Sequence, residues 1–266
     1  MPNLLFTLLA TLLYLGAAFA LARTATNSAS VPRAAGLWIA GLAVAIHGAL
    51  IASAHGGGLD LHFFAALSLV ALLVAAGTLA VNLARPVAAL GIIVFPLAAL
   101  LLGLDSWLAP PTHPLAFGWQ IKLHVVVALL AYAVLSVASV LALLLAAQER
   151  ALRNHRLGGG FLRVLPPLTL TESLMFRLIA GGFVLLSLTL LSGALFVDNM
   201  FAQHIVHKTV LSIIAWLVFG ALLFGRWRYG WRGRRAVRLM LLGMGVLLLA
   251  FFGSKFVLEL VLRRAA

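Results

Sequence analysis

The stretch VVVALLAYAVLSVASVLALLL, from Val125 to Leu145, decides the fold class of this chain. It contains no charged residue, and about 20 consecutive apolar residues are enough to cross a bilayer as a helix. A helix satisfies its backbone hydrogen bonds internally, as the hydrocarbon core requires. The apolar character extends from Phe117 to Ala147, which is longer than a bilayer is thick. The stretch therefore predicts a spanning helix that tilts or projects from the membrane.

The composition of the whole chain is that of an integral membrane protein. Its 266 residues are 64% hydrophobic and only 9% charged, and the mean hydropathy is +1.14. Because so little polar sequence is left for a soluble domain, we expect a single integral membrane domain over residues 1–266. The chain contains no cysteine, which excludes disulfides, thiol redox chemistry and Cys-ligated metal.

Apolar segments of spanning length recur along the chain and predict an all-α polytopic bundle of about eight transmembrane helices. The first segment lacks the basic n-region of a signal peptide, so we expect it to be a membrane helix as well. Thr169-x-x-Glu172 has the spacing of a capping box and predicts the start of the sixth helix. The predicted spans are Leu4–Ala22, Ala34–Ala54, Leu61–Val81, Val87–Leu104, Phe117–Ala147, Leu174–Val197, His204–Phe224 and Val237–Leu262.

Charged residues alternate between the loops that join these spans. Lys and Arg lie in the first, third, fifth and seventh loops, whereas the second, fourth and sixth carry only Asp60, Asp105 and Asp198. The positive-inside rule then places the odd loops in the cytoplasm and both termini on the extracytoplasmic side. The formal charge of +13 is therefore a topology signal, and we expect no nucleic-acid partner.

The histidines gather on the extracytoplasmic side of this predicted topology. His47 lies inside the outer half of the second span, and only His155 is cytoplasmic. Imidazole is a common ligand of haem iron and of other metals, so the pattern favours a cofactor site near the outer face. The histidines at or near that face are His55, His62, His113, His124, His204 and His207.

His47, His124 and His207 are the candidate haem-iron ligands among these residues. His47 is a polar side chain inside an apolar span, where polar residues tend to be functional. His124 opens the fifth span, and His207 lies at the start of the seventh. Lys122 and Lys208 stand beside them and could pair with the two propionates of haem.

Other interpretations of these residues remain open. A histidine at a helix end can simply be interfacial, and a lysine there can extend to lipid headgroups. Trp107 and Trp119 could stack on a porphyrin or belong to an aromatic belt. A zinc site is weakly indicated, because the His204-x-x-His207 spacing has no carboxylate partner.

Four longer phrases carry a resemblance to a known family. They are IKLHVVVALLAYAVLSVASVLALLLAAQE, LPPLTLTESLMFRLIAGGFVLLSLTLLSGALF, HKTVLSIIAWLVFGALLFGRWRYGWRGRRA and FFGSKFVLEL. Together they resemble the cytochrome c assembly superfamily of CcsA, CcmC and HemX proteins, over residues 37–262. The resemblance implies a multi-pass protein of the bacterial inner membrane that holds haem at its outer face and presents it to apocytochrome c.

The resemblance also assigns roles to particular residues. His124 matches the histidine that precedes the tryptophan-rich loop of the family, and Lys208 matches a lysine that closes this loop. His207 has no matching family ligand and is a local candidate. The tryptophan-rich motif is absent, since FVDNMFAQHIVHK stands in its place, and Phe224 stands where relatives carry a further histidine.

The leading hypothesis is a protein that binds and hands on haem through His124, with His47 or His207 as the second axial ligand. The sequence offers no nucleophile or paired carboxylates, so we expect a role without bond chemistry on a substrate. A small-solute transporter or channel with proton-relaying histidines is the second hypothesis. The third is an accessory scaffold for a partner complex, whose Arg226–Arg238 cluster contacts anionic lipid or an acidic partner.

Overall fold

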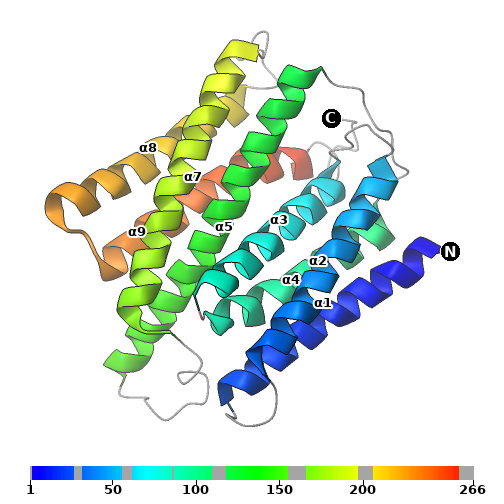
Figure 1. Ribbon diagram of the computed structural model, residues 1–266. Helices are drawn as coiled ribbons and strands as arrows, with labels where there is room; N and C mark the ends of the chain where they lie inside the picture. The colour runs from blue at the N-terminus through cyan, green and yellow to red at the C-terminus, as the bar shows by residue number, and fades with distance from the viewer. Residues whose placement is uncertain are drawn as a thin grey trace. The chain divides into compact units, whose positions relative to one another are not determined.

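The computed structural model describes residues 2–26, 32–55, 62–85, 87–109, 118–154, 166–196 and 206–257 (Figure 1). Eight helices in this part of the chain are long and apolar enough to cross a membrane, which confirms the predicted all-α fold. They are α1 (Pro2–Thr26), α2 (Arg33–His55), α3 (Phe63–Ala84), α4 (Ala88–Leu108), α5 (Trp119–Arg153), α7 (Leu168–Phe196), α8 (Val206–Tyr229) and α9 (Gly233–Leu248), which continues as the π-helical segment η1 (Leu249–Gly253).

The helix ends differ from the predicted spans by a few residues. α5 continues to Arg153 because the polar residues after Ala147 are themselves good helix formers. The predicted capping box is wrong in position, since α7 already begins at Leu168 and Thr169 lies inside its first turn. The backbone N–H of Thr171 donates to the carbonyl of Pro167 at 3.0 Å, so the helical ladder starts at Pro167.

The described helices form two compact units, each of which is considered by itself. Unit 1 comprises Met1–Ala116 and Ala147–Thr171, and unit 2 comprises Phe117–Ala146 and Glu172–Ala266. Helices α1 to α4 thus belong to unit 1, whereas α8, α9 and most of α5 and α7 belong to unit 2. The single membrane domain expected from the sequence stays a prediction.

In unit 1, α1 packs against α2 and α4, and α3 packs against α4 and α2. Small side chains let the backbones approach, as is common between membrane helices. Gly91 of α4 illustrates the fit, because a Cβ added there would lie 2.5 Å from Leu21 Cδ1 of α1. Deeper in the unit, the rings of Tyr14 and Phe95 stack with their centroids 6.0 Å apart.

Unit 2 is held together by aromatic side chains that pack on glycines of neighbouring helices. The Phe183 ring of α7 stacks on Trp216 of α8 with centroids 5.4 Å apart. The indole N–H of Trp216 also donates to Ser187 Oγ at 2.8 Å. Phe219 of α8 packs against Gly243 of α9, where an added Cβ would lie only 2.7 Å from the ring. Shape complementarity, together with polar contacts such as this one, therefore fixes the packing of α7, α8 and α9.

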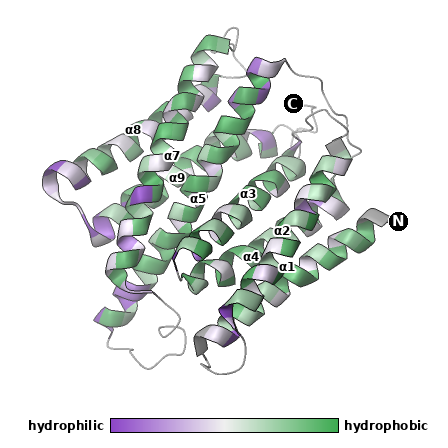
Figure 2. Cartoon of the chain, in the orientation of Figure 1, coloured by the Kyte–Doolittle hydropathy of each residue, from purple (hydrophilic) through white to green (hydrophobic). Residues whose placement is uncertain are grey.

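The outer surfaces of the helices are apolar. Figure 2 shows hydrophobic residues along the lengths of the helices and hydrophilic residues mainly near their ends. Large side chains such as Leu5, Phe19 and Leu191 are exposed on these surfaces. Apolar patches of this extent are unusual on water-soluble proteins and fit contact with lipid tails.

Adjacent glycines of α7 provide a matched test of the packing between α5 and α7. A Cβ at Gly182 would lie 2.6 Å from the buried side chain of Leu135, whereas a Cβ at Gly181 would meet nothing within 4 Å. We expect Gly182→Ala to destabilise the detergent-solubilised protein by about 1–3 kcal/mol through overpacking. Gly181→Ala should be neutral or slightly stabilising. Thermal unfolding measures both variants, and equal stability would contradict this packing.

Candidate functional site

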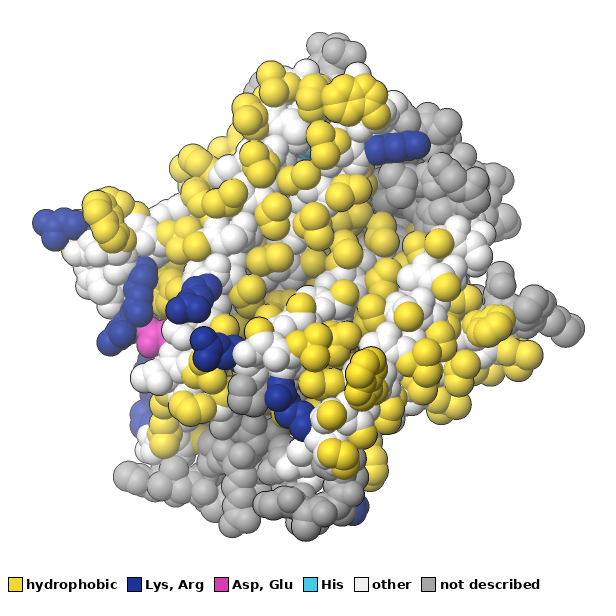
Figure 3. All heavy atoms as spheres, in the orientation of Figure 1, with side chains coloured by type: hydrophobic (Ala, Val, Ile, Leu, Met, Phe, Trp, Pro, Cys, Tyr) yellow, Lys and Arg dark blue, Asp and Glu magenta, His cyan; other side chains and the backbone are white. Residues whose placement is uncertain are grey.

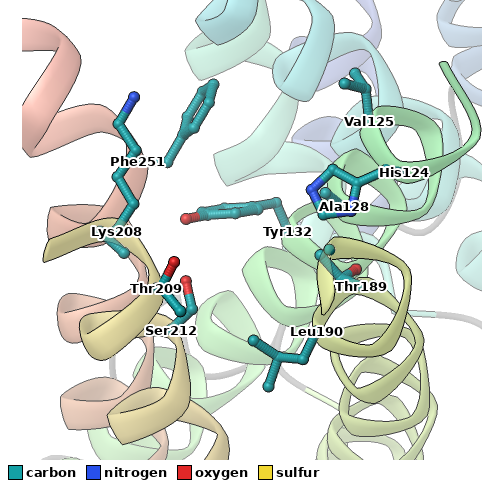
Figure 4. A pocket seen from close by; sticks show the side chains of 12 residues that line it. His124, Val125, Ala128, Tyr132, Thr189, Leu190, Lys208, Thr209, Ser212 and Phe251 are labelled. Atoms are coloured by element: carbon teal, nitrogen blue, oxygen red, sulfur yellow. The ribbon is translucent and has the colours of Figure 1, made fainter. Parts of the chain in front are cut away.

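A cavity of about 280 Å³ lies among α5, α7, α8 and η1 of unit 2 (Figure 4). This volume is just below the range of about 300–1,000 Å³ that is usual for small-molecule pockets. Its walls are mostly apolar and include Val125, Leu190 and Phe251. A few polar side chains interrupt them, among which His124 and Lys208 are the basic ones. An apolar cavity with few polar groups is the usual form of a ligand site.

His124 enters the cavity from α5 with its orientation fixed by α7. Its Nδ1 lies 2.9 Å from Ser192 Oγ, and the Ser192 hydroxyl donates to the carbonyl of Thr189 at 3.0 Å. Because the serine proton is used in that bond, its oxygen accepts from Nδ1–H. The proton of the neutral imidazole is then on Nδ1, and the lone pair is on Nε2. Metal-binding histidines use this arrangement, in which the second nitrogen is held by a hydrogen bond.

Lys208 of α8 lines the same cavity, and Figure 4 shows it across the cavity from His124. Lys255, which follows η1, has its Nζ 5.7 Å from the centroid of the Phe251 ring. Phe251 in turn lines the cavity, so positive charge is present on the side formed by α8 and η1. The structure thus brings together His124 and Lys208, two of the residues singled out from the sequence.

His207 and Lys122 do not line this cavity. Both side chains are exposed. His207 directly precedes Lys208, and consecutive residues of a helix point about 100° apart. The presence of Lys208 in the cavity wall therefore directs His207 elsewhere. The roles assigned to His207 and Lys122 stay predictions.

Tyr132 forms part of the cavity wall and connects α5 to the end of α9. Its hydroxyl donates to the carbonyl of Leu247, and its ring lies 6.0 Å from Phe251 and 5.8 Å from Phe252, between centroids. π-helical turns such as η1 are frequent at functional sites. We did not single out Tyr132 or Ser192 from the sequence. Both are polar side chains inside apolar spans, and this is the property by which His47 was selected from the sequence.

His47 has a different environment, in the interior of unit 1. Its Nδ1 lies 3.2 Å from the Tyr14 hydroxyl and its Nε2 lies 3.1 Å from Ser68 Oγ. All three side chains are fully buried. Both ring nitrogens are thus engaged, and the imidazole links α1, α2 and α3. Iron ligation by His47 stays a prediction that would require one of these bonds to break.

The remaining residues singled out from the sequence fall outside the cavity or outside the described residues. Trp107 and Trp119 are about two-thirds exposed near helix ends, as in an aromatic belt. The Nδ1 of His62 accepts the backbone N–H of Ala65 and caps α3. Within the described ranges, no three His or acidic side chains cluster as metal ligands do. The His55 side chain and His113, His155 and His204 lie outside the described part.

In the described part of the chain, eight apolar helices and a cavity lined by His124 and Lys208 define a polytopic α-helical membrane protein with a candidate small-molecule site. The family model described as "Cytochrome C assembly protein" matches residues 30–262. The chain therefore belongs to the cytochrome c assembly protein family, as the resemblance predicted. It is a multi-pass protein of the inner membrane.

Individual relatives support the same assignment. The chain is 41% identical over 138 residues to inner membrane protein YpjD of Escherichia coli K12, and the match covers 52% of each chain. It is 31% identical over 222 residues to the cytochrome c biogenesis protein CcsA of Synechococcus sp. JA-2-3B'a(2-13), which covers 62% of this chain and 63% of the relative. The chain thus spans about half to three fifths of these relatives. No solved structure matches it.

The environment of His47 generates a stability prediction. Removing the ring in His47→Ala leaves the Tyr14 and Ser68 hydroxyls without this partner in the interior of unit 1, which should cost about 1–3 kcal/mol. Thermal unfolding in detergent checks this value. Ser53→Ala, at an exposed position of the same helix, is the control and should have little effect. An unchanged transition in His47→Ala would contradict the buried hydrogen-bond network.

Proposed function

We propose that this protein binds haem in the cavity of unit 2 and hands it on during cytochrome c assembly. The single observation that carries the proposal is the His124–Ser192–Thr189 hydrogen-bond chain. With Nδ1–H donating to Ser192, the lone pair of the neutral imidazole would be on Nε2, the nitrogen that would bind a metal. Family membership and the name of the CcsA relative support the association with cytochrome c.

The cavity supplies the kinds of groups that bind haem. When bound, haem provides an iron that takes axial nitrogen ligands, a flat apolar macrocycle and two propionates. His124 would hold the iron, and the apolar walls formed by Val125, Leu190 and Phe251 would contact the macrocycle. Lys208 would pair with a propionate. A cavity of about 280 Å³ would enclose part of the macrocycle and leave its remainder accessible to a recipient.

His124 is the proposed first ligand of the iron. His47 and His207 remain the predicted second ligands, and Lys122 remains a predicted propionate contact. The start of α5 and the start of α8 carry His124 and Lys208, and the loop charges predict that both ends face the extracytoplasmic side. Haem held there would be on the side where apocytochrome c is expected to receive it.

Haem titration of the purified protein tests the proposal directly. Wild type should develop a Soret band on addition of haem, and His124→Ala should bind at least about tenfold more weakly because the axial nitrogen is lost. His62→Asn is the matched control, since it removes a histidine of unit 1 but keeps a good N-cap residue for α3. Absence of a Soret band in wild type, or identical titrations of wild type and His124→Ala, would exclude this function.

The hydroxyl of Ser192 gives a second, finer prediction. Ser192→Ala removes the acceptor of Nδ1–H and should lower haem affinity by about 10–100-fold, as is typical when the hydrogen-bond partner of a ligating histidine is lost. Ser192→Thr keeps a hydroxyl at this position and should restore most of the affinity. The same absorption titration measures both variants. If alanine and threonine behave alike, the hydrogen bond does not prepare His124 for ligation.

A further inference from the structure

The turn between α8 and α9 has a defined backbone conformation. Gly230 and Gly233 adopt φ of 64° and 54°, which other residues rarely do. The N–H of Gly230 donates to the carbonyl of Arg226 at 3.1 Å, which ends α8 in an αL cap. The Trp231 ring packs on Gly225, where an added Cβ would clash with the ring. The side chains of this turn are therefore presented from a fixed backbone.

Glu172 of α7 neutralises only part of the positive charge of this turn. Its Oε1 lies 3.1 Å from Arg226 Nη1 and 3.6 Å from Arg232 Nε. The Arg226 guanidinium also lies over the Phe176 ring, 4.6 Å from its centroid, and donates to the carbonyl of Trp231. These contacts hold the turn against the beginning of α7 and occupy the Glu172 carboxylate.

Arg228, Arg234 and Arg235 are exposed and form no ion pair with a carboxylate of the described residues. Arg228 lies over the Tyr229 ring and Arg235 over the Trp231 ring, with centroid distances of 5.7 and 5.0 Å. On one side of the face drawn in Figure 3, Lys and Arg side chains lie next to acidic atoms. Like charges that follow one another in the sequence of one turn, with no carboxylate partner in the described part of the chain, favour an anion as counter-ion.

The aromatic residues of the turn indicate the depth at which this charge lies. Trp227 is 81% exposed and Tyr229 is 65% exposed, directly after the apolar length of α8. Exposed Trp and Tyr at the end of a spanning helix lie at the level of the lipid headgroups. The adjacent guanidinium groups are then at the depth of the lipid phosphates.

We propose that Arg228, Arg234 and Arg235 form a binding surface for the phosphate groups of an anionic phospholipid. The planar guanidinium donates two parallel hydrogen bonds to a phosphate, which lysine cannot do. The surface selects against zwitterionic headgroups, because its carboxylate, Glu172, is already paired and offers little to an ammonium group. Basic surfaces of membrane proteins next to spanning helices recognise anionic lipid in this way. The proposal is independent of haem binding by unit 2.

Lipid selectivity of the purified, reconstituted protein tests this proposal. Spin-labelled phosphatidylglycerol and phosphatidylcholine are added separately to vesicles of phosphatidylcholine that contain the full chain, and electron paramagnetic resonance measures the lipid immobilised by the protein. Wild type should prefer phosphatidylglycerol to phosphatidylcholine by at least about fivefold. This ratio corresponds to a difference in binding free energy of about 1 kcal/mol, which is typical of one basic residue at an anionic membrane surface. The triple variant R228Q/R234Q/R235Q should lose most of this preference.

The matched control is R85Q/R150Q/R153Q, which removes the same charge from exposed arginines of unit 1 and should keep the preference. Equal loss in both triple variants would assign the effect to net charge and overturn the proposal. The absence of a preference for phosphatidylglycerol in wild type would also overturn the proposal. This result is expected if the surface binds an acidic protein instead of a lipid. Haem affinity should be unchanged in every variant, because the cavity is not altered. If the triple variant does not fold, the lipid preference of the single variants Arg228→Gln and Arg234→Gln is measured instead, and each should be lower than that of wild type.

Discussion

The absence of water in the bilayer core is the constraint on which the rest of this structure depends. Backbone groups must be satisfied internally, which leaves helices as the elements of this chain. Polar side chains inside the spans meet the same requirement by finding partners on other helices. His47 bonds to hydroxyls of α1 and α3, Trp216 to a hydroxyl of α7, and Tyr132 to a carbonyl at the end of α9. Each such pair determines which helices are neighbours. Apolar contacts alone do this poorly in a bilayer, because lipid tails are as apolar as the side chains.

The same requirement gives two histidines different chemical characters. His47 has a hydroxyl at each ring nitrogen, so its hydrogen-bonding capacity is used within unit 1. His124 donates from Nδ1 to the Ser192 hydroxyl, whose own proton is directed to the carbonyl of Thr189, and this carbonyl also acts on the His124 ring. The first arrangement stabilises a bundle, and the second prepares a nitrogen for an electrophile such as iron. Both ring nitrogens of His47 are bonded to hydroxyls of other helices, which fits a structural role, whereas His124 lines a cavity, which fits the proposed ligand role.

Sequence reasoning predicted the fold well and the site in part. Apolar length alone identified all eight spans, because spanning a bilayer is a property of one segment. His124 and Lys208 were both selected, the first for its place at the opening of a span and the second for its place beside a histidine. Ser192, Tyr132 and Phe251 were missed because their importance depends on which helices pack together, and the hydropathy pattern carries little of that information. The capping box was misplaced because the paired prolines before α7 start the helix earlier than Thr169 does.

The π-helical turn η1 has a consequence for how the last helix could have evolved. A π-turn is equivalent to one extra residue inserted into an α-helix, and one residue corresponds to about 100° of rotation. Side chains on either side of Leu249–Gly253 therefore follow two different angular registers around one axis. A single-codon deletion in this segment would restore uniform winding and swing Phe251 off the cavity wall. The additional residue therefore allows α9 to pack on α8 while Phe251 lies in the cavity wall.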